Sequence, residues 1–386
     1  MIEKCRICGN KIKNKIAGLC SNMKIMGSNF SEGRCDIVVC SKCGFVYNYY
    51  ENESQDNFDE YYLSKNSKTV NYYDIFPKEL AEQYFHHIYM SIKDFIYKDS
   101  SILDIAGGYG EFSRYLMDRG YTNVTMLEMK SECIEYAKSS GVDVIEGNLL
   151  EIPIKGDKYN LVICSHNLEH FIDIDKAILK MKEMIHDSGY IYIEVPNIVE
   201  YAQLERAPYH FLTYEHVCHF SKQTLLNIAS EFGFEIIYIK QYIKCDDYPC
   251  LFTLMKKSSG KKGMLKDYIS EKSMTDYLKK CECEIATITK IFETNQKPLI
   301  LWGIGASTAQ LLNGCFDACN VVQLIDSNVS RQGINFRVGQ KNLTIEDPKN
   351  VTDKDATILI LPTAYKNSIE KSIREYGLSN DVESLM

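Results

Sequence analysis

Two cysteine pairs near the start of the chain have the spacing of metal ligands. Cys5 and Cys8 form one Cys-x-x-Cys pair, Cys40 and Cys43 form a second, and a glycine follows each pair. Four thiolates from two such turns complete the tetrahedral shell that Zn²⁺ prefers, and a full sulfur shell leaves no position for a catalytic water. The two pairs therefore predict a structural zinc site.

A glycine-rich turn flanked by two acids is a second candidate site. Residues 102–110 read ILDIAGGYG, which predicts a buried strand containing Asp104, followed by a turn whose glycines let a ligand approach the backbone. Glu128 ends the next apolar run, eighteen residues after Gly110, where a carboxylate can accept both hydroxyls of a ribose. Ser113 replaces the third glycine of a dinucleotide fingerprint. The turn predicts a nucleoside ligand, with a purely structural turn as the alternative.

Two histidine-bearing segments supply candidate bases. The first reads HNLEH and ends at His170, and the second reads YEH and ends at His216. Histidine titrates near neutrality and suits proton removal. We predict that His216 is the base, that Glu215 orients it or shares its proton, and that His170 lies nearby. A role that only holds the loop is the alternative for His170.

The elements that must position these residues alternate between short apolar strands and amphipathic helices. This alternation predicts an α/β fold with a doubly wound parallel sheet. A later pair of apolar runs, with a turn around Asp246, predicts a hairpin that ends the sheet antiparallel. The expected strands are 102–105, 124–128, 142–146, 159–165, 190–196, 235–243 and 251–256, and the expected helices are 111–118, 131–139, 174–185 and 225–232.

A second, smaller α/β series follows a hydrated linker at 256–263 and a long polar helix at 264–294. It contains another glycine turn, with Gly303, Gly305 and Ala306, and Asp326 stands 21 residues after Gly305. Thr308 takes the place of the third glycine. We expect a degenerate nucleotide fold that helps to enclose the substrate, with a working NAD site as the alternative. The predicted domains are 1–60, 61–257 and 258–386.

Composition limits the class of protein. The chain has 386 residues, 45% apolar and 25% charged, with a net charge of -8, which indicates a globular protein of two or three domains that repels nucleic acid. No apolar signal core or membrane-length run is visible, so the 15 cysteines point to the reducing cytoplasm rather than to disulfides. Cys20 or Cys35 is an alternative zinc ligand, although core packing is the expected role of both.

The glycine turn resembles the first motif of class I S-adenosylmethionine-dependent methyltransferases, D-x-G-x-G-x-G, with Ala106 in place of the first glycine. Other segments follow in the family's order, including Asn148 in EGNLLEIP and the run YNLVICSHNLEHF. The resemblance implies S-adenosylmethionine as methyl donor and His166 as part of the donor pocket. The implied donor-binding residues are Asp104, Ala106, Gly107, Gly108, Gly110, Glu128, Asn148, Leu149, Ser165 and His166.

The whole chain is similar to the three-domain sugar C-methyltransferases, which methylate keto-sugar nucleotides. The similarity rests on the four-cysteine module, the YHFLTYEHVCHFS run and the carboxy-terminal WGIGAS and LIDSNVSRQGINFRVG runs. It maps the family's Glu-His onto Glu215 and His216, and its active-site tyrosine onto Thr213. Because Thr213 is not a tyrosine, both carbon and oxygen methylation stay open. A second family tyrosine corresponds to Tyr61 or Tyr62.

These features predict an enzyme that methylates a nucleotide-linked sugar or related small molecule, without nucleic acid or membrane partners. One alternative is a zinc-module RNA methyltransferase, because residues 1–50 carry eight Lys or Arg against three acids. Another is an NAD-dependent sugar-nucleotide enzyme or a non-catalytic binding protein. The sequence does not indicate the oligomeric state.

Overall fold

A computed structural model gives the fold of most of the chain. It describes residues 4–12, 14–22, 32–50, 54–64, 67, 69, 71–153, 158–245, 248–260, 263–305, 308–312, 314–362 and 365–385. Asp246 of the expected hairpin turn, Ala306 of the second glycine turn and residues 261–262 of the expected linker lie outside these ranges, and the side chain of Cys20 is not described.

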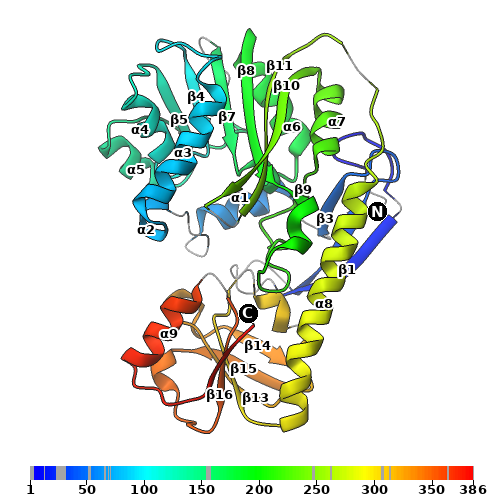
Figure 1. Ribbon diagram of the computed structural model, residues 1–386, viewed down its shortest axis with the longest axis vertical. Helices are drawn as coiled ribbons and strands as arrows, with labels where there is room; N and C mark the ends of the chain where they lie inside the picture. Colours follow the sequence, from blue (N-terminus) through cyan, green and yellow to red (C-terminus); the bar gives the residue numbers. More distant parts are fainter. Residues whose placement is uncertain are drawn as a thin grey trace.

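The central domain contains a seven-stranded sheet with the order β6-β5-β4-β7-β8-β11-β10 (Figure 1). Only β11 runs antiparallel to its neighbours, because the closing hairpin turns back and inserts β11 between β8 and β10. The predicted doubly wound fold is confirmed. The strands are β4 Ile102–Ile105, β5 Val124–Glu128, β6 Asp143–Glu146, β7 Tyr159–Ser165, β8 Ile185–Pro196, β10 Phe234–Lys244 and β11 Tyr248–Lys257.

Helices cover both faces of this sheet because its central strands are apolar on both sides. In β7, Leu161 and Ile163 pack in a core with α3 and α4, while Val162 and Cys164 pack in another with α6 and α7. Such alternation follows from the two-residue period of a strand. The helices are α3 Lys78–Ile92, α4 Glu111–Met117, α5 Ser131–Ser139, α6 Ile174–Met184 and α7 Lys222–Phe232.

A second, antiparallel sheet has the order β1-β2-β3-β9, with one cysteine pair before β1 and the other between β2 and β3. Its fourth strand, β9, comes from the segment after β8, so the central domain completes the amino-terminal sheet. Two short helices then lead into α3. These elements are β1 Asn14–Asn22, β2 Glu32–Val39, β3 Val46–Tyr50, β9 Cys218–His219, α1 Gln55–Leu63 and α2 Tyr72–Ile75.

The carboxy-terminal part is a six-stranded sheet with the order β14-β15-β13-β12-β16-β17, in which only β14 is antiparallel. The long helix α8 runs from the central domain to this sheet (Figure 1). Within the described residues, no helix combines the length and the apolar character that a membrane span needs. The elements are α8 Ile269–Asn295, β12 Leu299–Trp302, β13 Val321–Ile325, β14 Asn335–Val338, β15 Lys341–Glu346, β16 Thr357–Ile360, α9 Lys366–Glu375 and β17 Val382–Ser384.

Candidate active site

The glycine turn lies between the end of β4 and the start of α4, at the carboxyl edge of the sheet where open α/β folds bind ligands. Ala106 has φ 52° and Gly108 has φ 59°, so the chain is left-handed at both. Gly107 has no room for a side chain, because an added Cβ would lie 2.7 Å from Cγ of Met126. The local backbone thus keeps one side of the turn open.

Glu128 ends β5 beside this turn. Its Oε2 accepts a hydrogen bond from the Gly108 amide at 3.0 Å, and its Oε1 accepts from the amides of Met129 at 2.8 Å and Lys130 at 3.0 Å. Burial raises the pKa of Glu128, while these amides oppose the rise. The carboxylate is held at the position from which it can accept ribose hydroxyls.

Asp104 is buried below the turn. Its Oδ2 accepts a hydrogen bond from the Ser113 hydroxyl at 2.9 Å, and burial raises its pKa to about 7. Ser113, which replaces the fingerprint's third glycine, therefore serves as the partner of this acid. Asp104 thus lies at the floor of the turn, where it also lines the cavity described below.

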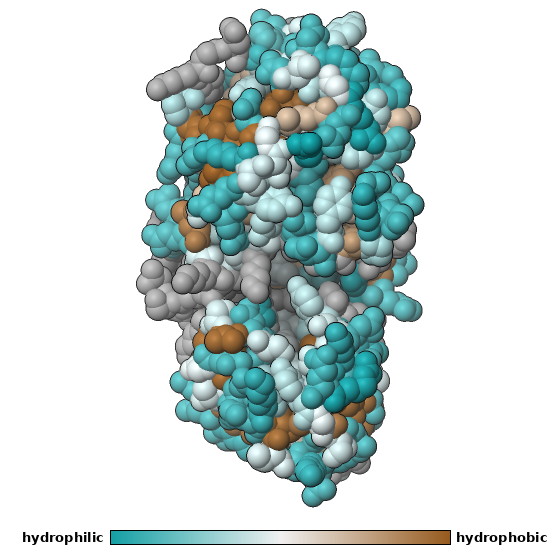
Figure 2. Space-filling model, turned by 90° about the vertical axis from the view of Figure 1, so that its left-hand side faces the viewer, coloured by the Kyte–Doolittle hydropathy of each residue, from teal (hydrophilic) through white to brown (hydrophobic). Residues whose placement is uncertain are grey.

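A cavity of about 860 Å³ opens over the turn, within the range of small-molecule sites. It is lined by most of the residues that the sequence predicts for the donor and for catalysis, and also by Tyr365 of the carboxy-terminal part. Figure 2 shows that this side of the molecule is mostly hydrophilic and is hollowed at the level between the two α/β parts. The predicted lining residues are Asp104, Ala106, Gly107, Gly108, Glu128, Asn148, Leu149, Ser165, His166, His170, Glu215 and His216.

Asn148 follows β6, on the far side of Glu128 from β4. Its side-chain amide donates to Oδ2 of Asp59 at 2.5 Å, and its carbonyl oxygen accepts from the Leu150 amide at 2.9 Å. Leu149 is buried beside it. Asp59 on α1 is a pocket residue that the sequence did not single out, because only the fold brings α1 over β6.

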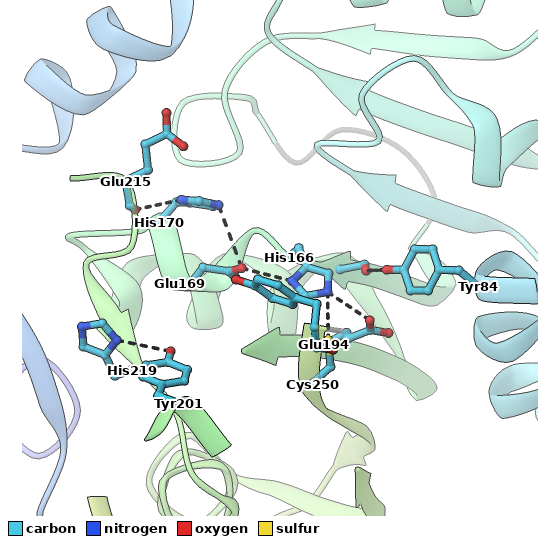
Figure 3. A network of polar contacts seen from close by, with 11 residues as sticks. Tyr84, His166, Glu169, His170, Glu194, Tyr201, Glu215, His219 and Cys250 are labelled. Atoms are coloured by element: carbon cyan, nitrogen blue, oxygen red, sulfur yellow. Dashed lines mark hydrogen bonds and ion pairs between the residues drawn. The ribbon is translucent and has the colours of Figure 1, made fainter. Parts of the chain in front are cut away.

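His166 lies in a buried polar network after β7 (Figure 3). Its Nδ1 lies 3.3 Å from Glu169 and its Nε2 lies 3.1 Å from Glu194. Burial and the charge of Lys244 would lower the pKa of His166, but its contacts with Cys250 and Glu169 reverse the sign and raise it. His166 lines the cavity, as expected of a donor-pocket residue. Its ring also connects the loop after β7 to Glu194 of β8.

The two predicted catalytic histidines lie side by side, with ring centroids 5.1 Å apart. His170 Nδ1 donates to the Glu215 carbonyl at 2.8 Å, which turns Nε2 toward Glu169 (Figure 3). Burial, followed by the neighbouring His170, lowers the pKa of His216 well below its ordinary value. The neutral form of His216 therefore predominates at physiological pH. Glu215 accepts a hydrogen bond from the Tyr61 hydroxyl at 2.5 Å.

Several buried polar atoms around these histidines have no hydrogen-bond partner in the described part of the chain. Burial raises the pKa of Glu169, but hydrogen bonding from His166 and the charge of His170 lower it to about 2, so Glu169 carries a charge. Buried polar atoms are ordinarily satisfied, so this grouping marks a place for a polar ligand. The unpartnered atoms of pocket-lining residues are Tyr62 Oη, Asn167 Oδ1, Glu169 Oε2 and His216 Nδ1.

The second glycine turn is occupied by a side chain of its own domain. An added Cβ at Gly305 would lie 2.9 Å from a guanidinium nitrogen of Arg331, and Arg331 lies 3.2 Å from Oδ2 of Asp326. Thr308 closes the turn through its hydroxyl, which donates to the Gly303 carbonyl at 2.6 Å. This packing favours the expected degenerate fold over an NAD site.

The four amino-terminal cysteines converge. Sγ of Cys5 lies 3.6 Å from Sγ of Cys43, and Sγ of Cys8 lies 3.5 Å from Sγ of Cys40. These separations exceed a disulfide bond of about 2.05 Å and are near the ~3.8 Å edge of a tetrahedron with Zn–S bonds of about 2.3 Å. The geometry fits Zn²⁺. Cys35 is buried in β2 and is not part of this group.

Part of the chain is similar to known methyltransferases. Residues 78–239 match the family model of a methyltransferase domain. No curated protein matches the chain. Similar solved structures include S-adenosylmethionine-dependent methyltransferases from Mesorhizobium loti (15% identity, 44% of this chain, 97% of that chain, TM-score 0.37), Methanosarcina mazei (18%, 44%, 97%, 0.37) and Clostridium acetobutylicum (12%, 53%, 99%, 0.38).

The strand order and the family match show that residues 78–239 of this chain form a methyltransferase domain. The methyltransferase domain of this protein carries two additions, a four-stranded amino-terminal sheet and a six-stranded carboxy-terminal sheet.

Proposed function

We propose that this enzyme transfers a methyl group from S-adenosylmethionine to a nucleotide-linked sugar or a related small molecule in the cytoplasm. The proposal rests on buried polar atoms in the cavity. Among the described residues, Nδ1 of His216 and Oε2 of Glu169 have no hydrogen-bond partner. A neutral imidazole beside a carboxylate suits removal of a proton from a hydroxyl or an acidic carbon. The free thiols of the described cysteines support a reducing compartment.

Residues at different positions in the cavity would bind the donor and accept the proton. Glu128 would hold the ribose of the donor, Asn148 would contact its adenine, and the glycine turn would lie against the ligand. The bound donor supplies an electrophilic methyl group. His216 would accept the acceptor's proton, and Glu215, held by Tyr61, would orient the catalytic segment.

The cavity wall supports an acceptor larger than a simple metabolite. Tyr365 lines the cavity although it belongs to the carboxy-terminal part, and Arg206 and His210 line it from the loop after β8. An acceptor with a nucleotide handle could extend between the two α/β parts, where the cationic side chain of Arg206 favours phosphate groups. We also propose that Cys5, Cys8, Cys40 and Cys43 bind a structural Zn²⁺.

Donor binding and turnover separate the proposed roles. Calorimetry with S-adenosylhomocysteine should show binding to the wild-type protein and its loss in Glu128→Ala, whereas His216→Ala should retain it. Mass spectrometry of co-purified small molecules should identify the acceptor, which then allows assays of turnover. Wild-type protein that does not bind S-adenosylhomocysteine, or His216→Ala protein with normal turnover, would contradict the proposal.

A further inference from the structure

Lys244, at the end of β10, places its ammonium group in the cavity wall between three tyrosine rings. Nζ lies 5.0 Å from the ring centroid of Tyr72, 4.9 Å from that of Tyr84 and 5.8 Å from that of Tyr248. The side chain lines the cavity and has no part in the proton transfer proposed above. Nothing in the sequence distinguished it from the other lysines of the chain.

This ammonium group lacks a carboxylate of its own. Among the described residues, Lys244 makes no ion pair within 4.0 Å, and the nearby Glu194 already pairs with His166 at 3.1 Å. Glu194 also accepts a hydrogen bond from the Tyr192 hydroxyl at 2.6 Å. Contacts with aromatic faces stabilise a desolvated cation by only ~2 kcal/mol, while lysine is rarely buried unless it is paired. Glu194 is near enough for its charge to favour the ammonium form of Lys244, but no described carboxylate lies within 4.0 Å of Nζ, which leaves the direct contact to a ligand oxyanion.

The tyrosine cage connects Lys244 to the donor side of the cavity. The Tyr84 hydroxyl is 2.8 Å from Oγ of Ser165, which ends β7 next to β4. The Tyr72 amide donates at 2.8 Å to Oε1 of Glu111, the first residue after the glycine turn. The same tyrosines that surround the ammonium group therefore also contact both segments that flank the donor site.

The order of the strands indicates which end of the donor would face Lys244. Asn148 follows β6 and Glu128 ends β5, so a donor with adenine and ribose there extends its amino-acid end across β4 toward β7. Strands lie about 4.8 Å apart, so the path from β5 to β7 is ~10 Å. That path leads to Ser165 and the tyrosine cage beyond it.

We propose that Lys244 binds an oxyanion in the cavity, either the methionine carboxylate of the donor or an acid group of the acceptor, and that the donor carboxylate is its partner. The inference rests on the proposed function, because it takes S-adenosylmethionine as the ligand of the glycine turn. It adds an anion-binding residue from β10, an edge strand of the sheet, whereas Glu128 lies on β5 near the other edge.

The first experiment removes, in turn, the ammonium group of Lys244 and the carboxylate of the ligand. Calorimetry compares S-adenosylhomocysteine with methylthioadenosine, which lacks the amino-acid carboxylate, on wild-type, Lys244→Met and Lys244→Arg proteins. We expect Lys244→Met to weaken S-adenosylhomocysteine roughly 10- to 100-fold, as for one charged hydrogen bond, and to leave methylthioadenosine unchanged. Lys244→Arg should retain most of the affinity. Lys240→Met is the matched control, since Lys240 lies on the same strand, is exposed and also contacts a tyrosine ring.

The second experiment separates the two sources of the anion. Inorganic phosphate is titrated into protein saturated with S-adenosylhomocysteine or with methylthioadenosine. A donor carboxylate at Lys244 predicts phosphate binding only in the methylthioadenosine complex. An acceptor acid group predicts phosphate binding in both complexes, lost in Lys244→Met, with unchanged affinity for S-adenosylhomocysteine.

Two results would overturn the inference without touching the proposed function. One is equal affinity of wild-type and Lys244→Met proteins for all three probes. The other is an equal loss of both nucleosides in Lys244→Met and Lys244→Arg, which would show a structural role. Failure of wild-type protein to bind either nucleoside would instead count against the proposed function itself.

Discussion

Ala106 departs from the glycine of the related motif, yet the structure keeps the backbone conformation that glycine favours. Its φ of 52° is left-handed, which costs a residue with a Cβ about 1 kcal/mol. We expect Ala106→Gly to raise the free energy of unfolding by about that amount and to preserve binding of S-adenosylhomocysteine. Thermal unfolding followed by circular dichroism measures the change.

Ala229→Gly, inside helix α7, is the matched control and should lower stability by about 1 kcal/mol. If Ala106→Gly destabilises the protein as much as this control does, the turn is not strained at position 106.

Asp104 gives a pH dependence with a definite sign. Burial raises its pKa to about 7 in the folded protein, against about 3.9 in the unfolded chain. Its contribution to stability is complete below the unfolded pKa and is lost as the pH rises toward about 7. We therefore compare the free energy of unfolding of Asp104→Asn with that of the wild type. The difference should grow in favour of the variant between about pH 5 and pH 7, by up to ~1.4 kcal/mol per pH unit, and then level off.

Urea unfolding at a series of pH values measures this difference. Ser113→Ala, which removes the hydroxyl that hydrogen-bonds Asp104, should raise the pKa of Asp104 further and move the titration to higher pH. A difference between wild-type and Asp104→Asn that does not vary with pH would contradict the prediction.

Residue identity alone predicted much of the site, because its chemistry depends on residue types at the ends of strands. Glu128 and the glycine turn do lie together, and His170 and His216 are neighbours although 45 residues separate them. What the sequence could not supply is the environment of each group. The pairing of His166 with the buried Glu194 depends on strands β7 and β8, which meet only in the folded sheet.

At the scale of elements, the amino-terminal sheet holds residues 213–219, the segment that contains the proposed base His216 and is called the catalytic segment below. Asn48 of β3 donates from its amide to the Val217 carbonyl at 2.8 Å and from its side chain to the His216 carbonyl at 3.0 Å. His219 lies 3.1 Å from Oδ1 of Asn48. Because Cys43 lies shortly before β3, the proposed metal site and the proposed base are both adjacent to this strand.

Removal of zinc should therefore loosen the catalytic segment. We expect chelation, or Cys43→Ser, to increase amide hydrogen exchange over 213–219, where protection depends on β3, and to change it little over 102–110. Hydrogen exchange followed by mass spectrometry measures both regions in one experiment. Exposed Cys283 provides the control, since Cys283→Ser should keep both the zinc and the protection. Unchanged exchange at 213–219 in metal-free protein would show that β3 does not depend on the metal.

Periodic patterns predicted the strands of the central sheet and helices α4, α5, α6 and α7 to within a few residues, but not the strands of the amino-terminal sheet. The long helix begins at Ile269 rather than at 264, after Asp267 accepts hydrogen bonds from the Ile269 and Ser270 amides. β9 was not predicted, because two residues carry no periodicity and their pairing with β3 joins Tyr47 to Cys218, which are 171 positions apart. Such a strand is defined by its partner and not by its own sequence.

At the scale of the whole molecule, one apolar core crosses all three parts. It includes Val46 of β3, Tyr201 after β8, Tyr277 of α8 and Leu301 of β12, all buried. Tyr201 stacks on Phe211 with ring centroids 4.2 Å apart. A core that continues through α8 should couple the unfolding of the two α/β parts.

Tyr201→Ala tests this coupling. The chain has one tryptophan, Trp302, which is buried in β12 of the carboxy-terminal sheet and reports on that sheet by its fluorescence. We expect the substitution, a loss of about 3–5 kcal/mol for a buried aromatic ring, to lower the midpoint seen by fluorescence as well as by circular dichroism. Ile88→Ala, in the separate core under α3, provides the comparison. A fluorescence midpoint that does not move in Tyr201→Ala would show that the parts unfold independently.

The two-residue strand β9 also constrains how the protein is made. During synthesis, β1, β2 and β3 leave the ribosome long before residues 218–219 do, so the edge of β3 stays uncovered over an interval of some 170 residues. An uncovered edge is prone to pair with other chains, and closing so distant a contact is slow. The nascent chain is thus most exposed to aggregation before residues 218–219 are made. A chaperone or early metal loading would protect its amino-terminal part during this interval.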